Sequence, residues 1–347
     1  MNLCQSYGRY IKQKAKAISG GGGGSSGPML ISSIGDVTAE SYAKYLGATV
    51  ADNGYIYGVP HRSTTILKIN PNDDTFIEFG FLEGNNKWWG AVLGNNGCIY
   101  CIPYQYDKIL KIDPYTDTYT EITKQYTSNN GYIVTRYSGG VLATNGYIYG
   151  IPWLGTKILK IDTDTDTCIE FDTSINDASV NYSGGVLTNN GCIYGVPVRN
   201  SQILKIDPST DTVTTFGDFS SYGTLNKWAG GVLASNGCIY CIPYKANTIL
   251  KIDPSDDTYT EFGELTNFNG YSGCLAADGC IYATNSFTNA TNFTPSVLKI
   301  DPTTDTITLT PIELDSSIGW DVCGSIASNG CIYATPSNGT AILKIRP

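Results

Sequence analysis

The stretch NGCIYCIP, residues 96–103, returns six more times along the chain in closely related form. The other copies read NGYIYGVP, NGYIYGIP, NGCIYGVP, NGCIYCIP, DGCIYATN and NGCIYATP. The glycines they share are Gly54, Gly97, Gly146, Gly191, Gly237, Gly279 and Gly330, at spacings of 42 to 51 residues. Repeats of this length are typical of the blades of a β-propeller. The sequence therefore predicts an all-β fold made of seven copies of one unit.

Each copy carries four strand signals in a fixed order. In the third copy these are YSGGVLATNG (137–146), YIYGIPW (147–153), KILKIDTDTDT (157–167) and CIEFD (168–172). The Asn-Gly pair is typical of a tight hairpin turn, and the segment related to Asp-Pro-x-Thr-Asp-Thr supplies a second turn. Both strand faces read as apolar, as expected for blades that stack around an axis. We predict a seven-bladed propeller of four-stranded antiparallel blades.

The last copy lacks its fourth strand, because the chain ends with AILKIRP at residues 341–347. Near the other end, MLISSIGDV at residues 29–37 aligns with DTVTTFGDF at residues 211–219, the fourth strand of an earlier copy. We expect residues 29–37 to complete the seventh blade, which closes the ring and removes an exposed strand edge. The domain organisation predicted is a basic head (1–18), a Gly/Ser tether (19–28) and the propeller (29–347).

The NGxIY element followed by an Asp-Pro-x-Thr-Asp-Thr turn resembles kelch-type and related bacterial and viral β-propeller repeats over residues 29–347. The kelch double glycine is replaced here by GVP, CIP or GIP. The resemblance implies a propeller that binds other molecules, and it implies no catalytic residue.

Composition narrows the class of protein. The formal charge of −9 argues against a nucleic-acid surface, and no apolar run reaches the length of a membrane-spanning helix. Residues 1–18 lack the apolar centre of a signal peptide, so we expect synthesis in the cytosol. Five of the 11 cysteines (Cys98, Cys192, Cys238, Cys280 and Cys331) share a repeat position with Tyr55 and Tyr147, which predicts free, packed thiols.

The sequence contains few residues whose pattern indicates catalysis or metal binding. His61 is the single histidine and falls in the segment PHRSTT, which we interpret as a surface loop. The stretch DTDTDT (162–167) has Thr167 where a calcium loop needs Gly, so it is interpreted as a repeat turn. The sequence predicts no cofactor, no metal site and no enzymatic activity. Two alternatives remain: a metal bound on the axis by carboxylates from several blades, and an enzyme acting on a sugar or small metabolite there.

Comparing the copies separates scaffold from function. The Asn-Gly and Asp-Pro turns are nearly constant and share one rim, and seven in-register lysines are expected to pair with carboxylates between blades. The loops that vary share the opposite rim and are rich in aromatic residues, as protein and sugar-binding surfaces are. The predicted ligand contacts are Trp88, Tyr104, Tyr106, Tyr132, Trp153 and Tyr244.

The head carries Arg9, Lys12, Lys14 and Lys16 without an acid, and its spacing is compatible with a short amphipathic helix. We interpret it as an anchor that displays the ring on a larger assembly, such as a virion capsid or fibre appendage. The predicted function is recognition or attachment, with a glycan or protein bound on the variable rim. The alternatives are the propeller enzyme and an intracellular protein-interaction scaffold.

Overall fold

The computed structural model describes residues 29–37, 42–123, 136–173, 182–266, 268–285, 296–312 and 320–347. The strands are β1 (Leu30–Ile34), β2 (Tyr45–Val50), β3 (Ile56–Pro60), β4 (Ile66–Asn70), β5 (Thr75–Phe79), β6 (Trp88–Leu93), β7 (Ile99–Pro103), β8 (Lys108–Asp113), β9 (Thr118–Thr123), β10 (Arg136–Leu142), β11 (Ile148–Leu154), β12 (Lys157–Asp162), β13 (Thr167–Asp172), β14 (Tyr182–Leu187), β15 (Ile193–Pro197), β16 (Ile203–Asp207), β17 (Thr212–Phe216), β18 (Trp228–Leu233), β19 (Ile239–Pro243), β20 (Ile249–Asp253), β21 (Thr258–Phe262), β22 (Gly270–Leu275), β23 (Ile281–Asn285), β24 (Ser296–Asp301), β25 (Thr306–Pro311), β26 (Trp320–Ile326), β27 (Ile332–Pro336) and β28 (Ile342–Arg346). A short 3₁₀ helix, η1, spans Ser220–Tyr222. In these ranges no helix is long and apolar enough to cross a membrane.

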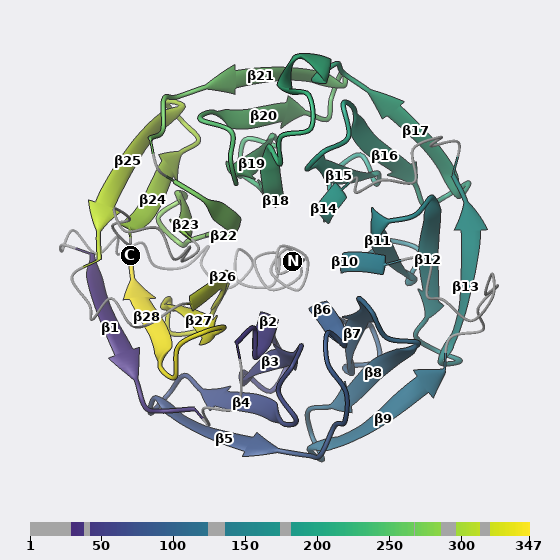
Figure 1. Ribbon diagram of the computed structural model, residues 1–347, viewed down its shortest axis with the longest axis vertical. Coiled ribbons are helices and arrows are strands. Elements are labelled where there is room, and N and C mark those ends of the chain that lie inside the picture. Colours follow the sequence, from purple (N-terminus) through teal and green to yellow (C-terminus); the bar gives the residue numbers. More distant parts are fainter. Residues whose placement is uncertain are drawn as a thin grey trace, which may run out of the picture.

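The strands form seven four-stranded antiparallel sheets arranged as a ring (Figure 1). Six sheets take four consecutive strands each, from β2–β5 (blade 1) to β22–β25 (blade 6). The first strand of each blade lies next to the axis and the fourth lies on the perimeter (Figure 1). The predicted seven-bladed propeller is confirmed.

Blade 7 is built from both ends of the described chain, in the order β1-β28-β27-β26. Strand β1 pairs antiparallel with β28, from Leu30 opposite Arg346 to Ile34 opposite Ile342. The backbone N–H of Val37 continues the contact by donating to the carbonyl of Thr340 at 2.6 Å. The predicted closure of the ring by residues 29–37 is therefore confirmed.

Burial decreases from the axis outward. All six residues of β2 and of β6 are buried, whereas the perimeter strand β9 alternates between exposed and half-buried side chains. The expectation that both sheet faces are buried holds for the inner strands. On the perimeter the wedge-shaped blades diverge, so one face of the fourth strand meets solvent.

The constant turns lock each blade to the next. Lys68 of blade 1 lies 2.6 Å from the carboxylate of Asp117 in blade 2, and the hydroxyl of Tyr57 donates to the same carboxylate at 2.9 Å. Asp117 takes a left-handed φ of 55°, which its position in the turn requires. The equivalent pairs are Lys111–Asp166, Lys160–Asp211, Lys205–Asp257, Lys251–Asp305 and Lys344–Asp74, at 2.5 to 2.6 Å. These pairs confirm the predicted pairing between blades for six of the seven repeated lysines.

The seventh lysine, Lys299 of blade 6, has no such turn to face, because β1 replaces the fourth strand that would follow a turn in blade 7. It pairs instead with Asp278 of its own blade at 3.1 Å, and Tyr282 donates to the same carboxylate at 2.8 Å. Asp278 occupies the place of the repeated Asn, whose Nδ2 in other blades donates to a turn carbonyl of the next blade, as Asn236 does to Pro302 at 2.9 Å. The single DG copy in the sequence is thus a consequence of how the ring closes.

Two reciprocal single substitutions, one at Asp278 and one at Asn236, are predicted to destabilise the protein. Asp278→Asn removes the carboxylate that holds Lys299, and Asn236→Asp puts a carboxylate against the Pro302 carbonyl. Each change is expected to lower the free energy of unfolding by about 1 kcal/mol. Because hydrogen bonds and Lys299 hold the pKa of Asp278 below its usual value, the effect of Asp278→Asn should disappear as the pH falls through that pKa. Urea unfolding of both variants at pH 7 and at a series of lower pH values tests this, and an unchanged midpoint for Asp278→Asn at pH 7 would contradict it.

Candidate functional site

Buried lysines hold the loops of the variable rim in place. Lys87 is fully buried, and its ammonium donates to the carbonyls of Ser63 at 2.9 Å and Gly84 at 2.8 Å. Its backbone N–H donates to His61, and its carbonyl accepts from the N–H of Tyr104. Burial lowers the pKa of Lys87 to about 8. This lysine ties the loop after β3 to the loop after β7, and Lys44 and Lys227 occupy equivalent buried positions.

Four aromatic side chains from blades 1 to 3 gather where these loops meet the axis. Trp89 lies at their centre, with ring centroids 5.0 Å from Tyr104 and 5.0 Å from Trp153. His61 completes the group, 5.5 Å from Tyr104 and 6.4 Å from Trp89. Trp89 is 7% exposed, while Tyr104 and Trp153 are half-buried and present part of their rings to solvent. We call His61, Trp89, Tyr104 and Trp153 the aromatic platform.

The platform is built from positions that differ between blades. His61, Tyr104 and Trp153 each follow the proline of the second strand, where other blades carry Val198, Tyr244 and Ser337. Trp89 follows the buried aromatic that opens the innermost strand, where other blades carry Leu46, Ser138, Ser183 and Ala229. Because the scaffold does not require an aromatic residue at either position, its presence there points to a role other than folding.

The sequence-based interpretation of His61 as a surface residue is wrong. The side chain is 4% exposed, and Nδ1 lies 2.9 Å from the carbonyl of Trp88. A carbonyl only accepts, so Nδ1 carries the proton and Nε2 carries the lone pair. Burial lowers the pKa of His61 to about 4, which keeps the imidazole neutral at pH 7. The loop is held inward by the hydrogen bonds from and to Lys44 and Lys87, which the sequence did not reveal.

This burial predicts a pH dependence. Between pH 4 and pH 6.5 the unfolded chain binds a proton at His61 that the folded chain does not, so His61 makes stability rise with pH in that window. Relative to neutral pH, wild type should lose about 2 kcal/mol at pH 5 through this residue. His61→Asn keeps a donor near the Trp88 carbonyl and should remove this part of the loss. Urea unfolding at pH 5 and pH 7.5 measures the difference, and an identical pH slope in both proteins would refute the assignment.

The structure places the other predicted contacts in different surroundings. Trp88 is fully buried and donates from Nε1 to the carbonyl of Lys108 at 2.7 Å, so it belongs to the packing between blades and is no ligand contact. Tyr106 packs against Trp88 with centroids 5.2 Å apart, and its hydroxyl donates to Glu121 at 3.1 Å. Tyr132 lies outside the described residues.

Tyr244 belongs to a second aromatic group, from blades 5 and 6. Its ring lies 4.5 Å from that of Tyr271, with 39° between the ring planes. Tyr271 in turn packs against the apolar cluster that contains Leu46 and Trp89. The pair Tyr244–Tyr271 therefore continues the aromatic surface from the platform toward the other side of the axis. The sequence-based prediction included neither Trp89 nor Tyr271, which the structure places in these two aromatic groups.

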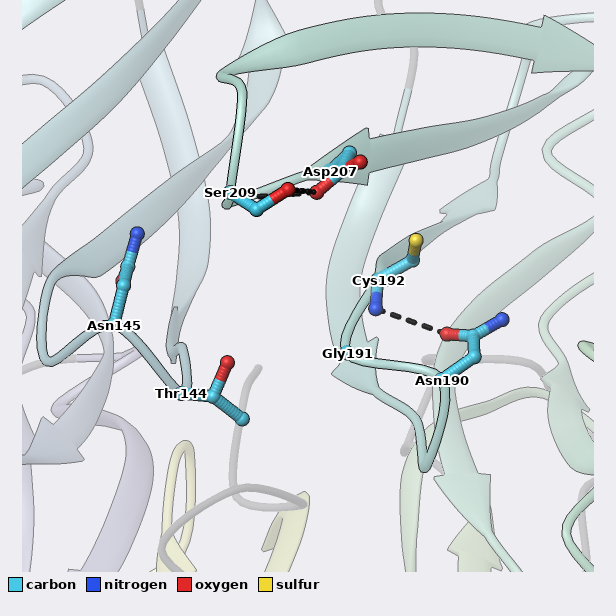
Figure 2. A pocket seen from close by; sticks show the side chains of 7 residues that line it. All are labelled: Thr144, Asn145, Asn190, Gly191, Cys192, Asp207 and Ser209. Atoms are coloured by element: carbon cyan, nitrogen blue, oxygen red, sulfur yellow. Dashed lines mark hydrogen bonds between the residues drawn. The ribbon is translucent and has the colours of Figure 1, made fainter.

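A cavity of about 340 Å³ opens on the opposite rim, between the constant turns of blades 3 and 4 (Figure 2). Its lining includes Asn190, Cys192, Asp207 and Ser209. These groups are engaged in their own turns: Ser209 Oγ donates to Asp207 at 2.7 Å, and the N–H of Cys192 donates to Asn190 at 2.9 Å. The lining residues are repeat-turn positions, so this cavity belongs to the scaffold.

Within the described ranges, no three His, Cys, Asp or Glu side chains gather as ligands of a metal ion would. The nine cysteines whose side chains the structure describes are free. The head and tether (1–28) lie outside the described residues, and their attachment to a larger assembly stays a prediction.

The fold is similar to solved propellers of several kinds. A catalytically inactive variant of virginiamycin B lyase from Staphylococcus aureus, with quinupristin, superposes with a TM-score of 0.75 at 20% identity, over 92% of this chain and 100% of that one. A streptogramin B lyase gives 0.73 at 16% identity, over 91% and 97%. The extracellular domain of a proposed one component system from B. thetaiotaomicron gives 0.65 at 15% identity, over 91% of this chain and 42% of that one. No protein-family model and no curated protein sequence matches the chain.

These similarities establish the class, a seven-bladed β-propeller, and give no specific support to a kelch-type repeat. They also contradict the prediction that the protein is not an enzyme, because lyases are among the structures that share its fold. That prediction came from the single histidine and the absence of motifs. A propeller assembles its site from loops of several blades, however, and spacing along the chain does not reveal such a site.

Proposed function

We propose that the protein is a recognition propeller that binds a saccharide on the aromatic platform. The observation that carries the proposal is the gathering of His61, Tyr104 and Trp153 around Trp89, with ring centroids 5.0 to 6.4 Å from that of Trp89, at positions that the scaffold leaves free to vary. Partly exposed Tyr and Trp rings provide rigid contact area at low entropic cost, which favours a binding role.

A saccharide is favoured over a purely apolar ligand by what borders the platform. Asn86 donates from Nδ2 to Gln105 at 2.9 Å, and both side chains are half-buried. Gln105 directly follows Tyr104 in the chain. Amide groups both donate and accept, as hydroxyl groups do. A sugar needs aromatic faces that pack against the C–H surface of its ring. It also needs planar polar groups nearby that hydrogen-bond to its hydroxyls, and the platform and its border offer both.

The test uses a platform variant and a matched control. Trp153→Ala is expected to weaken saccharide binding at least tenfold, because it removes one of the two half-buried platform rings, the other being Tyr104. Tyr115→Ala removes an aromatic ring that is 68% exposed on the opposite rim and should leave binding unchanged. A glycan array identifies the saccharide, and calorimetric titration compares the three proteins. Equal affinity in all three would contradict the proposal.

Catalysis at the same place is a second candidate, favoured by one observation. Because Nδ1 of His61 is held by the Trp88 carbonyl, Nε2 of a neutral imidazole carries the lone pair that a general base needs. The lyases of similar fold support testing this chemistry. Mass spectrometry after incubation with virginiamycin B, and with the saccharides found on the array, should reveal a product that His61→Asn does not form. Unchanged substrates with wild type would exclude this candidate for those compounds.

A further inference from the structure

A row of four polar side chains runs along the border of the platform. The Nε of Arg62 donates to Asn86 at 2.8 Å, and Asn86 Nδ2 lies 2.9 Å from the Gln105 amide. The Gln105 amide also lies 2.8 Å from Nη1 of Arg136. The row therefore has a guanidinium at each end and two amides between them. Arg136 stands close to the platform itself, with Cζ 5.7 Å from the ring centroid of Tyr104.

Neither guanidinium has a carboxylate partner among the described residues. No ion pair joins Arg62 or Arg136 to a described Asp or Glu, whereas the seven repeated lysines each have one. The Nε of Arg136 is also buried without a hydrogen-bond partner in this part of the chain. A chain with a formal charge of −9 has ample carboxylates for pairing, so two unpaired cations beside the platform need an explanation.

Both arginines keep unused donors. Asn86 Oδ1 accepts from Nε of Arg62, whose guanidinium also lies over the ring of Tyr42, 4.0 Å from its centroid. Gln105 Oε1 accepts from Asn86 Nδ2, so the other end of this amide, its NH2 group, faces Nη1 of Arg136 and accepts nothing from it. The nearby ammonium of Lys87 is already bound by two carbonyls and cannot serve an incoming ligand. Guanidinium groups bind carboxylates through paired N–H donors, and a fixed guanidinium loses less entropy when it does so.

Building on the proposed function, we propose that the saccharide is acidic, and that Arg136 beside Tyr104 binds its carboxylate while Arg62, at the other end of the row, adds positive charge and the platform stacks on the sugar ring. The ligand class is an acidic saccharide, with a uronic or a sialic acid as the source of the carboxylate. Its charge complements the two cations, and its ring complements Tyr104 and Trp153.

The chain contains its own control. In blades 4 and 5, Arg199 donates from Nε to Asn226 in the same way that Arg62 donates to Asn86. Val198 and Ala229 stand there in place of His61 and Trp89, and Tyr244 is the counterpart of Tyr104, so this second arginine lacks the four-residue platform. If an arginine–asparagine pair alone bound anions, Arg62–Asn86 and Arg199–Asn226 would both bind the acidic saccharide. If the platform is required, only Arg62 and Arg136 matter.

The experiment compares matched saccharides. An array carries uronic-acid oligosaccharides beside their carboxyl-reduced forms, and sialylated glycans beside their desialylated forms. Wild type should prefer one acidic family over its neutral counterpart at least tenfold, and the preference should shrink as NaCl is raised. The double variant Arg62→Gln/Arg136→Gln should bind the acidic and neutral forms with equal affinity, and Arg199→Gln should keep the wild-type preference.

Each outcome separates the two proposals. Equal binding of acidic and neutral forms by wild type overturns the acidic-ligand inference and leaves saccharide recognition intact. The inference is also overturned if Arg199→Gln removes the preference as fully as the double variant does. Binding of no saccharide by a wild-type protein with a normal unfolding transition overturns the proposed function, and this inference with it. Comparing the uronic-acid oligosaccharides with the sialylated glycans on the array shows which acid supplies the carboxylate.

Discussion

Replacing Gly230 with alanine is expected to lower the free energy of unfolding by about 3 kcal/mol or more. Gly230 lies in β18 next to the axis, with φ of +72°, a conformation that costs an alanine about 1 kcal/mol. An added Cβ would lie 2.5 Å from the carbonyl oxygen of Tyr271 and 2.9 Å from Cα of Ser272. Both atoms are backbone of β22 in the next blade. In a closed ring that strand cannot retreat without disturbing its other neighbour, so overpacking adds about 2 kcal/mol.

Gly237→Ala is the matched control. Gly237 has φ of +85°, yet its added Cβ would meet nothing within 4 Å. This variant should therefore lose only the conformational cost of about 1 kcal/mol. Urea unfolding of both variants with a common m-value gives the comparison. Equal losses would show that the blades at the axis are less tightly packed than the structure indicates.

Much of the scaffold could be predicted because the same turns and contacts recur from blade to blade. Seven copies of one hairpin turn define the blade count, and the missing fourth strand of the last copy predicts the closure by residues 29–37. The Lys–Asp pairs follow for the same reason, since a charged residue at a constant position needs a constant partner. Even the exception at Asp278 appears in the sequence as the single DG copy. Its cause appears only when blade 7 is seen to lack a turn facing Lys299.

The site was harder to predict because two neighbouring tryptophans have opposite roles. In β6 the register shifts between Trp88 and Ala91, and Gly90 takes φ of +76°. Trp88 enters the packing between blades, and Trp89 lies with Tyr104 and Trp153. A comparison of the copies could have separated them, because the position of Trp88 is a buried aromatic in several blades while the position of Trp89 varies. The contacts among these aromatic side chains depend on how the blades are arranged around the axis. The spacing of residues along the sequence does not encode that arrangement.

Deleting residues 1–37 is expected to cost about 5 kcal/mol or more and to make the protein self-associate. The deletion removes β1 and Val37, which is 1% exposed, together with the half-buried Met29, Ile31 and Ile34. Each apolar side chain contributes about 1.5 to 3 kcal/mol when fully buried. The deletion also uncovers β28, whose unpaired backbone would present a strand edge to other chains. Calorimetry and light scattering measure the two effects.

The control deletion ends nine residues earlier, and a peptide provides the reverse experiment. Removing residues 1–28 leaves the pairing of Leu30 to Ile34 with β28 intact, so the unfolding transition should stay within about 1 kcal/mol of wild type. Adding a peptide of residues 29–37 to the longer deletion should restore the monomer and raise its transition, since strand addition to an open edge supplies the missing ladder. A monomeric 38–347 protein with wild-type stability would show that three strands suffice for blade 7, and the role assigned to β1 would be wrong.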